Sequence, residues 1–79
     1  MNEKVKKLSD LKVGQSCIIE SLSSVGAVRR RLIDLGFAPG ASVECIGISP
    51  LGDPKAYCVR QTVIALRRGD AGEIRVMTE

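Results

Sequence analysis

Residues 24–49 read SVGAVRRRLIDLGFAPGASVECIGIS, and they combine the signals for a helix, a tight turn and a strand. Within this segment four apolar residues are spaced by three, four and three positions, as on one stripe of an α-helix: Val25, Val28, Leu32 and Leu35. The side chain of Ser23 or Ser24 can cap the start of that helix, and Gly36 stands where a left-handed residue commonly ends one. The sequence therefore predicts an amphipathic α-helix over residues 24–35.

The residues after the helix predict a chain reversal and a bent strand. Phe37 can make the hydrophobic contact that follows a helix C-terminus, and Pro39 and Gly40 suit the two central positions of a type II turn. Residues 42–49 are rich in β-branched and aliphatic side chains, which is typical of a strand. Their apolar positions change parity around Gly47, so we expect a bulge or sharp bend at that glycine.

Four further strands are indicated by short β-rich runs between turn signals, over residues 16–22, 55–60, 62–66 and 73–78. Residues 8–14 predict one short helical turn before the first of them. The segment PLGDP at 50–54 predicts a loop, with Pro50, Gly52 and Pro54 as structural positions. About five short strands and one inserted helix predict a mainly β fold, a small and strongly bent barrel.

Length and composition indicate one globular domain. A chain of 79 residues has room for a single core, so we place one domain over residues 1–79, with a flexible N-terminal arm at 1–7. Hydrophobic residues make up 44% and charged residues 27%, as in a globular domain that is not disordered. The N-terminus lacks the apolar core of a signal peptide, so we expect a cytoplasmic location and no membrane insertion.

The types of side chain present argue against catalysis. The sequence has no histidine, which removes the commonest general base and a common metal ligand, and its glycines match neither nucleotide-binding pattern. Its cysteines, Cys17, Cys45 and Cys58, lie in apolar contexts without a C-x-x-C pair, which favours buried, inert thiols. We therefore expect no enzyme activity and no cofactor. A weakly held divalent metal, ferrous iron, would find its candidate ligands at Asp70 and Glu73.

Three consecutive arginines, residues 29–31, suggest a nucleic-acid patch until they are placed on the helix. Successive helical side chains are separated by about 100°, so the three splay apart. Arg30 and Asp34 then lie on the outer face as an i,i+4 pair, with Ile33 exposed beside them. Because the chain has only two aromatic residues, we expect a protein partner and no nucleic acid. The residues expected to contact that partner are Arg30, Ile33, Asp34, Leu51 and Asp53.

Four sequence segments form a recognisable combination: LSDLKVG at 8–14, RLIDLGFAPG at 31–40, PLGDP at 50–54 and ALRRGDAGEIRV at 65–76. In this combination the chain resembles the FeoA family, ferrous iron transport protein A, over residues 8–78. One departure is Gln61, where family members often have glycine. The resemblance implies an SH3-like small barrel with a helical insertion. The motif residues Gly36, Pro39 and Gly40 are characteristic of this fold, and the resemblance implies no catalytic role for them.

The resemblance also implies a function. It implies a cytoplasmic accessory protein of bacterial ferrous iron uptake, which binds and modulates the membrane permease FeoB, a protein with its own GTPase domain. Related domains stand at the C-terminus of iron-dependent repressors of the diphtheria-toxin-repressor type. The alternative is therefore a domain that itself senses ferrous iron or another transition metal. Exposed edge strands would also allow a homodimer through β-pairing.

Overall fold

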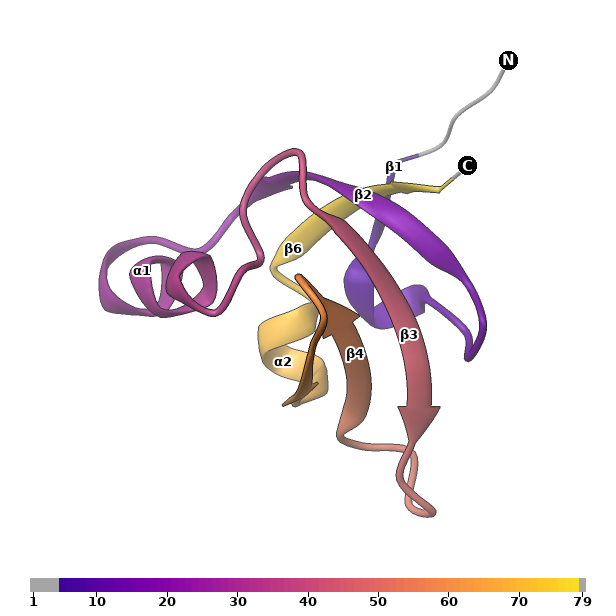
Figure 1. The fold of residues 1–79 in the computed structure, drawn as a ribbon. Coiled ribbons are helices and arrows are strands. Elements are labelled where there is room, and N and C mark those ends of the chain that lie inside the picture. The colour runs from indigo at the N-terminus through magenta and orange to yellow at the C-terminus, as the bar shows by residue number, and fades with distance from the viewer. Residues whose placement is uncertain (1–4, 79) are drawn as a thin grey trace.

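The computed structural model describes residues 5–78, which form a six-stranded antiparallel sheet with strand order β1-β6-β2-β3-β4-β5 (Figure 1). The strands are β1 (Val5–Lys7), β2 (Ser16–Leu22), β3 (Ser42–Ile48), β4 (Lys55–Val59), β5 (Thr62–Leu66) and β6 (Ile74–Thr78). The helical elements are η1 (Leu8–Asp10), α1 (Gly26–Asp34) and α2 (Arg68–Ala71). The sheet curves strongly, and α1 stands to one side of it (Figure 1). The predicted mainly β class is confirmed.

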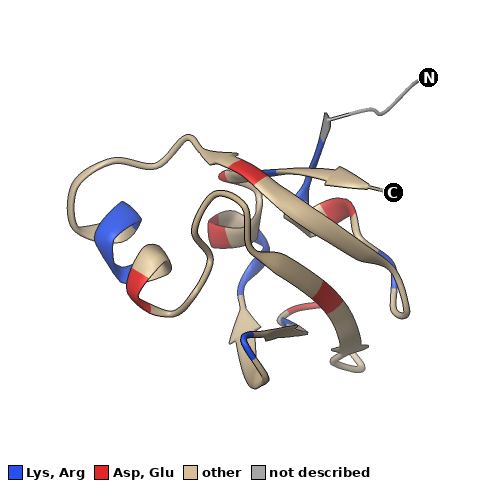
Figure 2. Ribbon diagram, turned by 45° about the horizontal axis from the view of Figure 1, so that its top comes forward, with Lys and Arg blue, Asp and Glu red and all other residues tan. Residues whose placement is uncertain are grey.

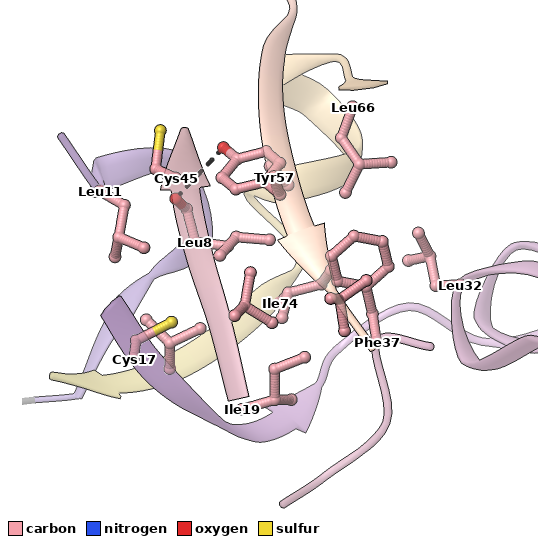
Figure 3. Close-up of a cluster of buried hydrophobic side chains, with 14 of the residues drawn as sticks. Leu8, Leu11, Cys17, Ile19, Leu32, Phe37, Cys45, Tyr57, Leu66 and Ile74 are labelled. Carbon is pink, nitrogen blue, oxygen red and sulfur yellow. Dashed lines mark hydrogen bonds between the residues drawn. The ribbon is translucent and has the colours of Figure 1, made fainter. Parts of the chain in front are cut away.

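One hydrophobic core lies inside the curved sheet. Its larger members are fully buried and come from the strands, η1, α1 and the segments that follow η1 and α1 (Figure 3): Leu8, Leu11, Ile19, Leu32, Phe37, Tyr57 and Ile74. The rings of Phe37 and Tyr57 pack edge to face, with centroids 6.4 Å apart and planes at 89°. Buried and exposed residues alternate along β2 and β3, so the opposite face of the sheet is turned to solvent.

Residues 5–7 differ from the prediction of a flexible arm over 1–7. They add a sixth strand to the sheet, for which about five strands were predicted. They form β1, which pairs with β6 so that Lys6 lies opposite Val76. This pairing was not predictable from local pattern, because a three-residue strand with two lysines shows no alternation of its own and its partner lies at the far end of the chain. Residues 1–4 of the predicted arm lie outside the described residues.

The other five predicted strands are confirmed, with bounds that agree to within one residue. The register between β3 and β4 shifts between Cys45 and Gly47, which confirms the predicted bulge near that glycine. Because of this bulge, Ile46 is an extra residue on β3 and lies exposed on the outer face.

The C-terminal end of α1 confirms the predicted helix stop. The N–H of Gly36 donates to the carbonyl of Ile33 at 2.9 Å, and that of Phe37 donates to the carbonyl of Leu32 at 3.0 Å. These are the two bonds of a Schellman motif. Gly36 has a φ of +113°, which favours glycine, and Phe37 follows it into the core (Figure 3).

The predicted turn after the helix is also confirmed. The N–H of Ala41 donates to the carbonyl of Ala38 at 3.0 Å, with Pro39 and Gly40 between them. Gly40 has a φ of +91°, as the third position of a type II turn requires. Its N–H donates to the carbonyl of Ile19 at 2.8 Å, which attaches the turn to β2.

The beginning of α1 differs from the prediction. The helix starts at Gly26, and neither predicted serine caps it. The Ser23 hydroxyl donates to the backbone carbonyl of Glu73 at 3.2 Å, and the Ser24 hydroxyl is buried without a partner among the described residues. The reason is tertiary: the backbone N–H of Ser23 also donates to the Glu73 carbonyl, so the chain after β2 stays attached to the residue before β6.

The predicted apolar stripe of α1 is only partly buried, which corrects its assignment to the core. Leu32 is buried, whereas Val25, Val28 and Leu35 are 80%, 42% and 38% exposed. Since α1 stands at one side of the sheet, only one side of its last turns reaches the core (Figure 1). Ile33, expected to be exposed, is half-buried and packs against the core, so that expectation was wrong.

Candidate functional site

The candidate metal ligands lie close together in the sequence, with Asp70 on α2 and Glu73 between α2 and β6. Among residues 5–78 no three cysteine, aspartate or glutamate side chains converge as metal ligands would. The Asp70 carboxylate instead accepts a hydrogen bond from the Arg31 guanidinium at 3.0 Å, an ion pair that joins α2 to α1. Glu73 is exposed, and its backbone carbonyl accepts the bonds from Ser23. The Asp70 carboxylate is therefore already held in an ion pair with another residue of the chain.

The cysteines do not form a reactive group. Cys17 and Cys45 are buried free thiols, as expected, whereas Cys58 is half-buried on β4, which differs from the expectation. Burial raises the pKa of the Cys17 thiol to about 11, so this group stays protonated at neutral pH. In this protonated form the Cys17 thiol is a poor nucleophile.

The loop between β3 and β4 is held against α2 by a hydrogen bond. The Asp53 carboxylate accepts the backbone N–H of Arg68 at 2.9 Å, where α2 begins. The Ser49 hydroxyl donates to the Asp53 carbonyl at 2.8 Å and closes the loop. Leu51, in the same loop, is 93% exposed. Asp53 therefore has a structural role, while Leu51 is free to meet another molecule.

Two polar side chains of β4 fasten the segment around η1. The Lys55 ammonium donates to the carbonyls of Ser9 and Leu11 at 2.8 and 2.6 Å. The Tyr57 hydroxyl donates to the carbonyl of Leu8 at 3.4 Å, the dashed line in Figure 3. Burial raises the pKa of Tyr57, so it acts as a neutral donor. Both side chains serve the fold and are not free to act as a general acid or base.

The most exposed cluster of predicted contact residues lies on α1. Figure 2 shows a basic segment in blue and an acidic one in red on this helix, which carries arginines at 29–31 and one acidic residue, Asp34. Arg30 and Asp34 are both exposed, but the one ion pair found among residues 5–78 joins Arg31 to Asp70, so the predicted Arg30–Asp34 pair is not formed. We call the exposed side of the helix the α1 face, made of Ala27, Val28, Arg30, Asp34 and Leu35.

The N-terminal end of α1 is electrostatically unusual. It has no side-chain cap and no acidic residue in its first turn, and arginines follow at 29–31. Free N–H groups give a helix N-terminus a partial positive charge, which favours anions and disfavours cations. The first turn of α1 is therefore electropositive and has the exposed apolar side chain of Val28 beside it, whereas Arg31, in the last turn, is paired with Asp70. Such a surface suits a protein partner that supplies carboxylates and apolar contacts.

Comparison with known proteins gives the family. A model of the FeoA domain matches residues 6–78 of the chain. The chain belongs to the FeoA family. This FeoA-family chain is 33% identical over 70 residues to an Fe(2+) transport protein A/Fe(2+) transporter FeoB fusion protein of Porphyromonas gingivalis. The match covers 89% of this chain and 8% of the fusion protein, so the chain spans less than a tenth of that relative. The FeoA family acts in ferrous iron transport.

Solved structures confirm the fold. The zinc complex of Stenotrophomonas maltophilia FeoA, described as a prokaryotic SH3 domain protein, matches with a TM-score of 0.78 and 34% identity, over 89% of this chain and 87% of that one. The SH3-like prediction is thereby confirmed. A manganese-dependent transcriptional repressor matches with a TM-score of 0.85 but 11% identity, over 100% of this chain and 44% of its own, which shows the fold alone. No helix within residues 5–78 has the length and apolarity needed to cross a bilayer.

Proposed function

We propose that this chain is a cytoplasmic accessory protein that binds a FeoB-type ferrous iron permease and modulates its transport. The observation that carries the proposal is the relative in which FeoA and the transporter FeoB form one polypeptide. Fusion holds two modules at high effective concentration, which is useful when the modules contact each other. We propose that this chain makes the same contact with the permease.

The chemistry of the described residues supports action by contact. Three polar side chains that could serve a reaction are bonded within the fold: Lys55 and Tyr57 to the segment around η1, and Asp53 to α2. We infer that the chain works without catalysis and without a resident metal. Ferrous iron is then the cargo of the permease.

We propose the α1 face as the contact surface. On this face the exposed Arg30 lies at one edge and the exposed apolar side chains of Val28 and Leu35 lie at the other, about 140–160° around the helix. Arginine and apolar residues at the centre of an interface commonly carry most of its binding energy. A charge reversal at Arg30 should therefore cost at least about 1.4 kcal/mol of binding free energy, a tenfold loss of affinity.

A titration of the intact permease in lipid nanodiscs with the purified chain tests both parts of the proposal. The wild-type chain is expected to bind saturably, Arg30→Glu about tenfold more weakly, and the matched control Arg75→Glu within about twofold of wild type. Arg75 is exposed on β6, and its reversal changes the net charge equally. Absence of wild-type binding would refute the proposed function. Equal binding by the two variants would refute the α1 face.

A further inference from the structure

The two edges of the sheet differ in how they are protected. β1 is one edge strand and carries Lys6 and Lys7, exposed charged residues of the kind that discourage further strand pairing. β5 is the other edge strand, and within residues 5–78 it pairs with β4 alone. Its sequence, TVIAL, has no charge, proline or glycine. β5 is therefore an unprotected apolar edge, which is the template that an added strand needs.

The register identifies which groups of β5 are available. Val59 and Thr62 face each other across a two-residue turn, so they exchange both backbone hydrogen bonds. Such bonded pairs alternate along an antiparallel ladder, so Ile64 and Leu66 also direct their backbone groups toward β4. The N–H and C=O groups of Val63 and Ala65 consequently face the open edge.

The outer face of the sheet beside this edge is apolar. Val63 is 62% exposed, and Cys58 lies opposite it on β4. Ala65 lies opposite Ala56, and Ile46 is 41% exposed on β3 beyond them. An added strand would therefore find both free backbone groups and an apolar surface for alternate side chains.

The charged residues at the two ends of β5 indicate which kind of strand could pair with this edge. Arg60 precedes the strand, and Arg67 and Arg68 follow it, all of them exposed. If two copies of this chain paired through β5 about Ile64, Arg60 of each copy would face Arg68 of the other, and like charges opposite each other are destabilising. At the C-terminal end of β5 the Asp53 carboxylate accepts the backbone N–H of Arg68. Among residues 5–78, however, the guanidinium groups of Arg60, Arg67 and Arg68 form no ion pair. The edge therefore disfavours self-pairing and favours a strand with acidic ends.

We propose that β5 accepts an extended segment of a partner protein as a seventh strand, and that this segment carries acidic residues on both sides of an apolar centre. Arginines at both ends of β5 make the electrostatic match independent of strand direction. The proposal goes beyond the contact through α1 and does not depend on it, because the two surfaces are on different elements.

A peptide titration followed by NMR tests the proposal on the full chain. The probe is a blocked peptide of alternating valine and threonine with two aspartates at each end, and its counterpart carries two lysines at each end. The acidic peptide is expected to shift the amide signals of Val63 and Ala65 and to slow their hydrogen exchange, with much smaller changes in protection at Ile64. The lysine peptide is expected to bind at least about tenfold more weakly at low salt.

Three variants distinguish pairing at the β5 edge from nonspecific binding of the peptide. Val63→Pro removes an edge-facing N–H while leaving the bonds to β4 in place, and should abolish peptide binding, whereas Val63→Thr should retain it. Arg67→Glu keeps the whole backbone and should weaken binding of the acidic peptide several-fold, so the proposal stays testable if the proline variant fails to fold. Equal binding of both peptides would overturn the proposal. So would amide changes away from β5, or a wild-type dimer with Val63 at its interface.

Discussion

Removing the Asp53 carboxylate should destabilise the fold. In Asp53→Ala the backbone N–H of Arg68 loses its acceptor at 2.9 Å, at the first residue of α2. This bond resembles a helix-capping interaction, whose loss costs about 1 kcal/mol. For a domain of this size that cost lowers Tm by about 4–8 °C. Asp53→Asn retains a carbonyl acceptor and should lose less than Asp53→Ala.

Urea unfolding, monitored by circular dichroism, measures this change, and Asp34→Ala is the matched control. Asp34 is exposed on α1 and makes no side-chain hydrogen bond or ion pair to another residue within 5–78. Its substitution should alter the free energy of unfolding by less than about 0.5 kcal/mol. If Asp53→Ala keeps wild-type stability and yet loses permease binding, Asp53 is a partner contact and the structural reasoning is refuted.

Gln61 has a φ of +66°, a conformation that glycine adopts without strain. Gln61→Gly is therefore expected to raise the free energy of unfolding in urea by about 0.5–1 kcal/mol. An equal gain in Gln61→Ala would contradict this explanation. Burial raises the pKa of the Cys17 thiol from 9.0 to about 11, so the free energy of unfolding should be constant just below pH 9 and should fall as the pH rises toward 11. In Cys17→Ala this fall should be smaller. Anaerobic calorimetry of ferrous iron into the reduced chain should show no 1:1 site tighter than about micromolar. A tighter site that Asp70→Asn abolishes would favour the metal sensor.

Local chemistry made part of the fold predictable. The end of α1 depends on Gly36 and the following turn on Pro39 and Gly40, and these residues act through backbone preferences that hold in any context. The strands were recognisable for a similar reason, because alternation and turn residues are local signals. Lys55 shares strand parity with the inward-facing Tyr57 and Val59, so the alternation along β4 itself indicates its place at the inner face.

The remaining features depend on tertiary placement. The stripe of α1 has helical spacing, but burial of Val25 and Val28 required a surface against that side of the helix, and the fold does not supply one. The binding partner of Asp53 is the backbone of a helix fifteen residues away, which no spacing rule predicts. The same limit applies to the candidate site. Exposure of Arg30 was predictable, whereas the open edge at β5 became visible only with the strand order.

Ferrous iron uptake into proteoliposomes that contain the permease, with GTP supplied, tests the central claim most directly. Increasing amounts of the chain should change the rate of uptake saturably. Arg30→Glu should require about tenfold more protein for the same change, and Arg75→Glu should match the wild type. An uptake rate that stays constant at every concentration of folded wild-type chain would contradict an accessory role in permease function.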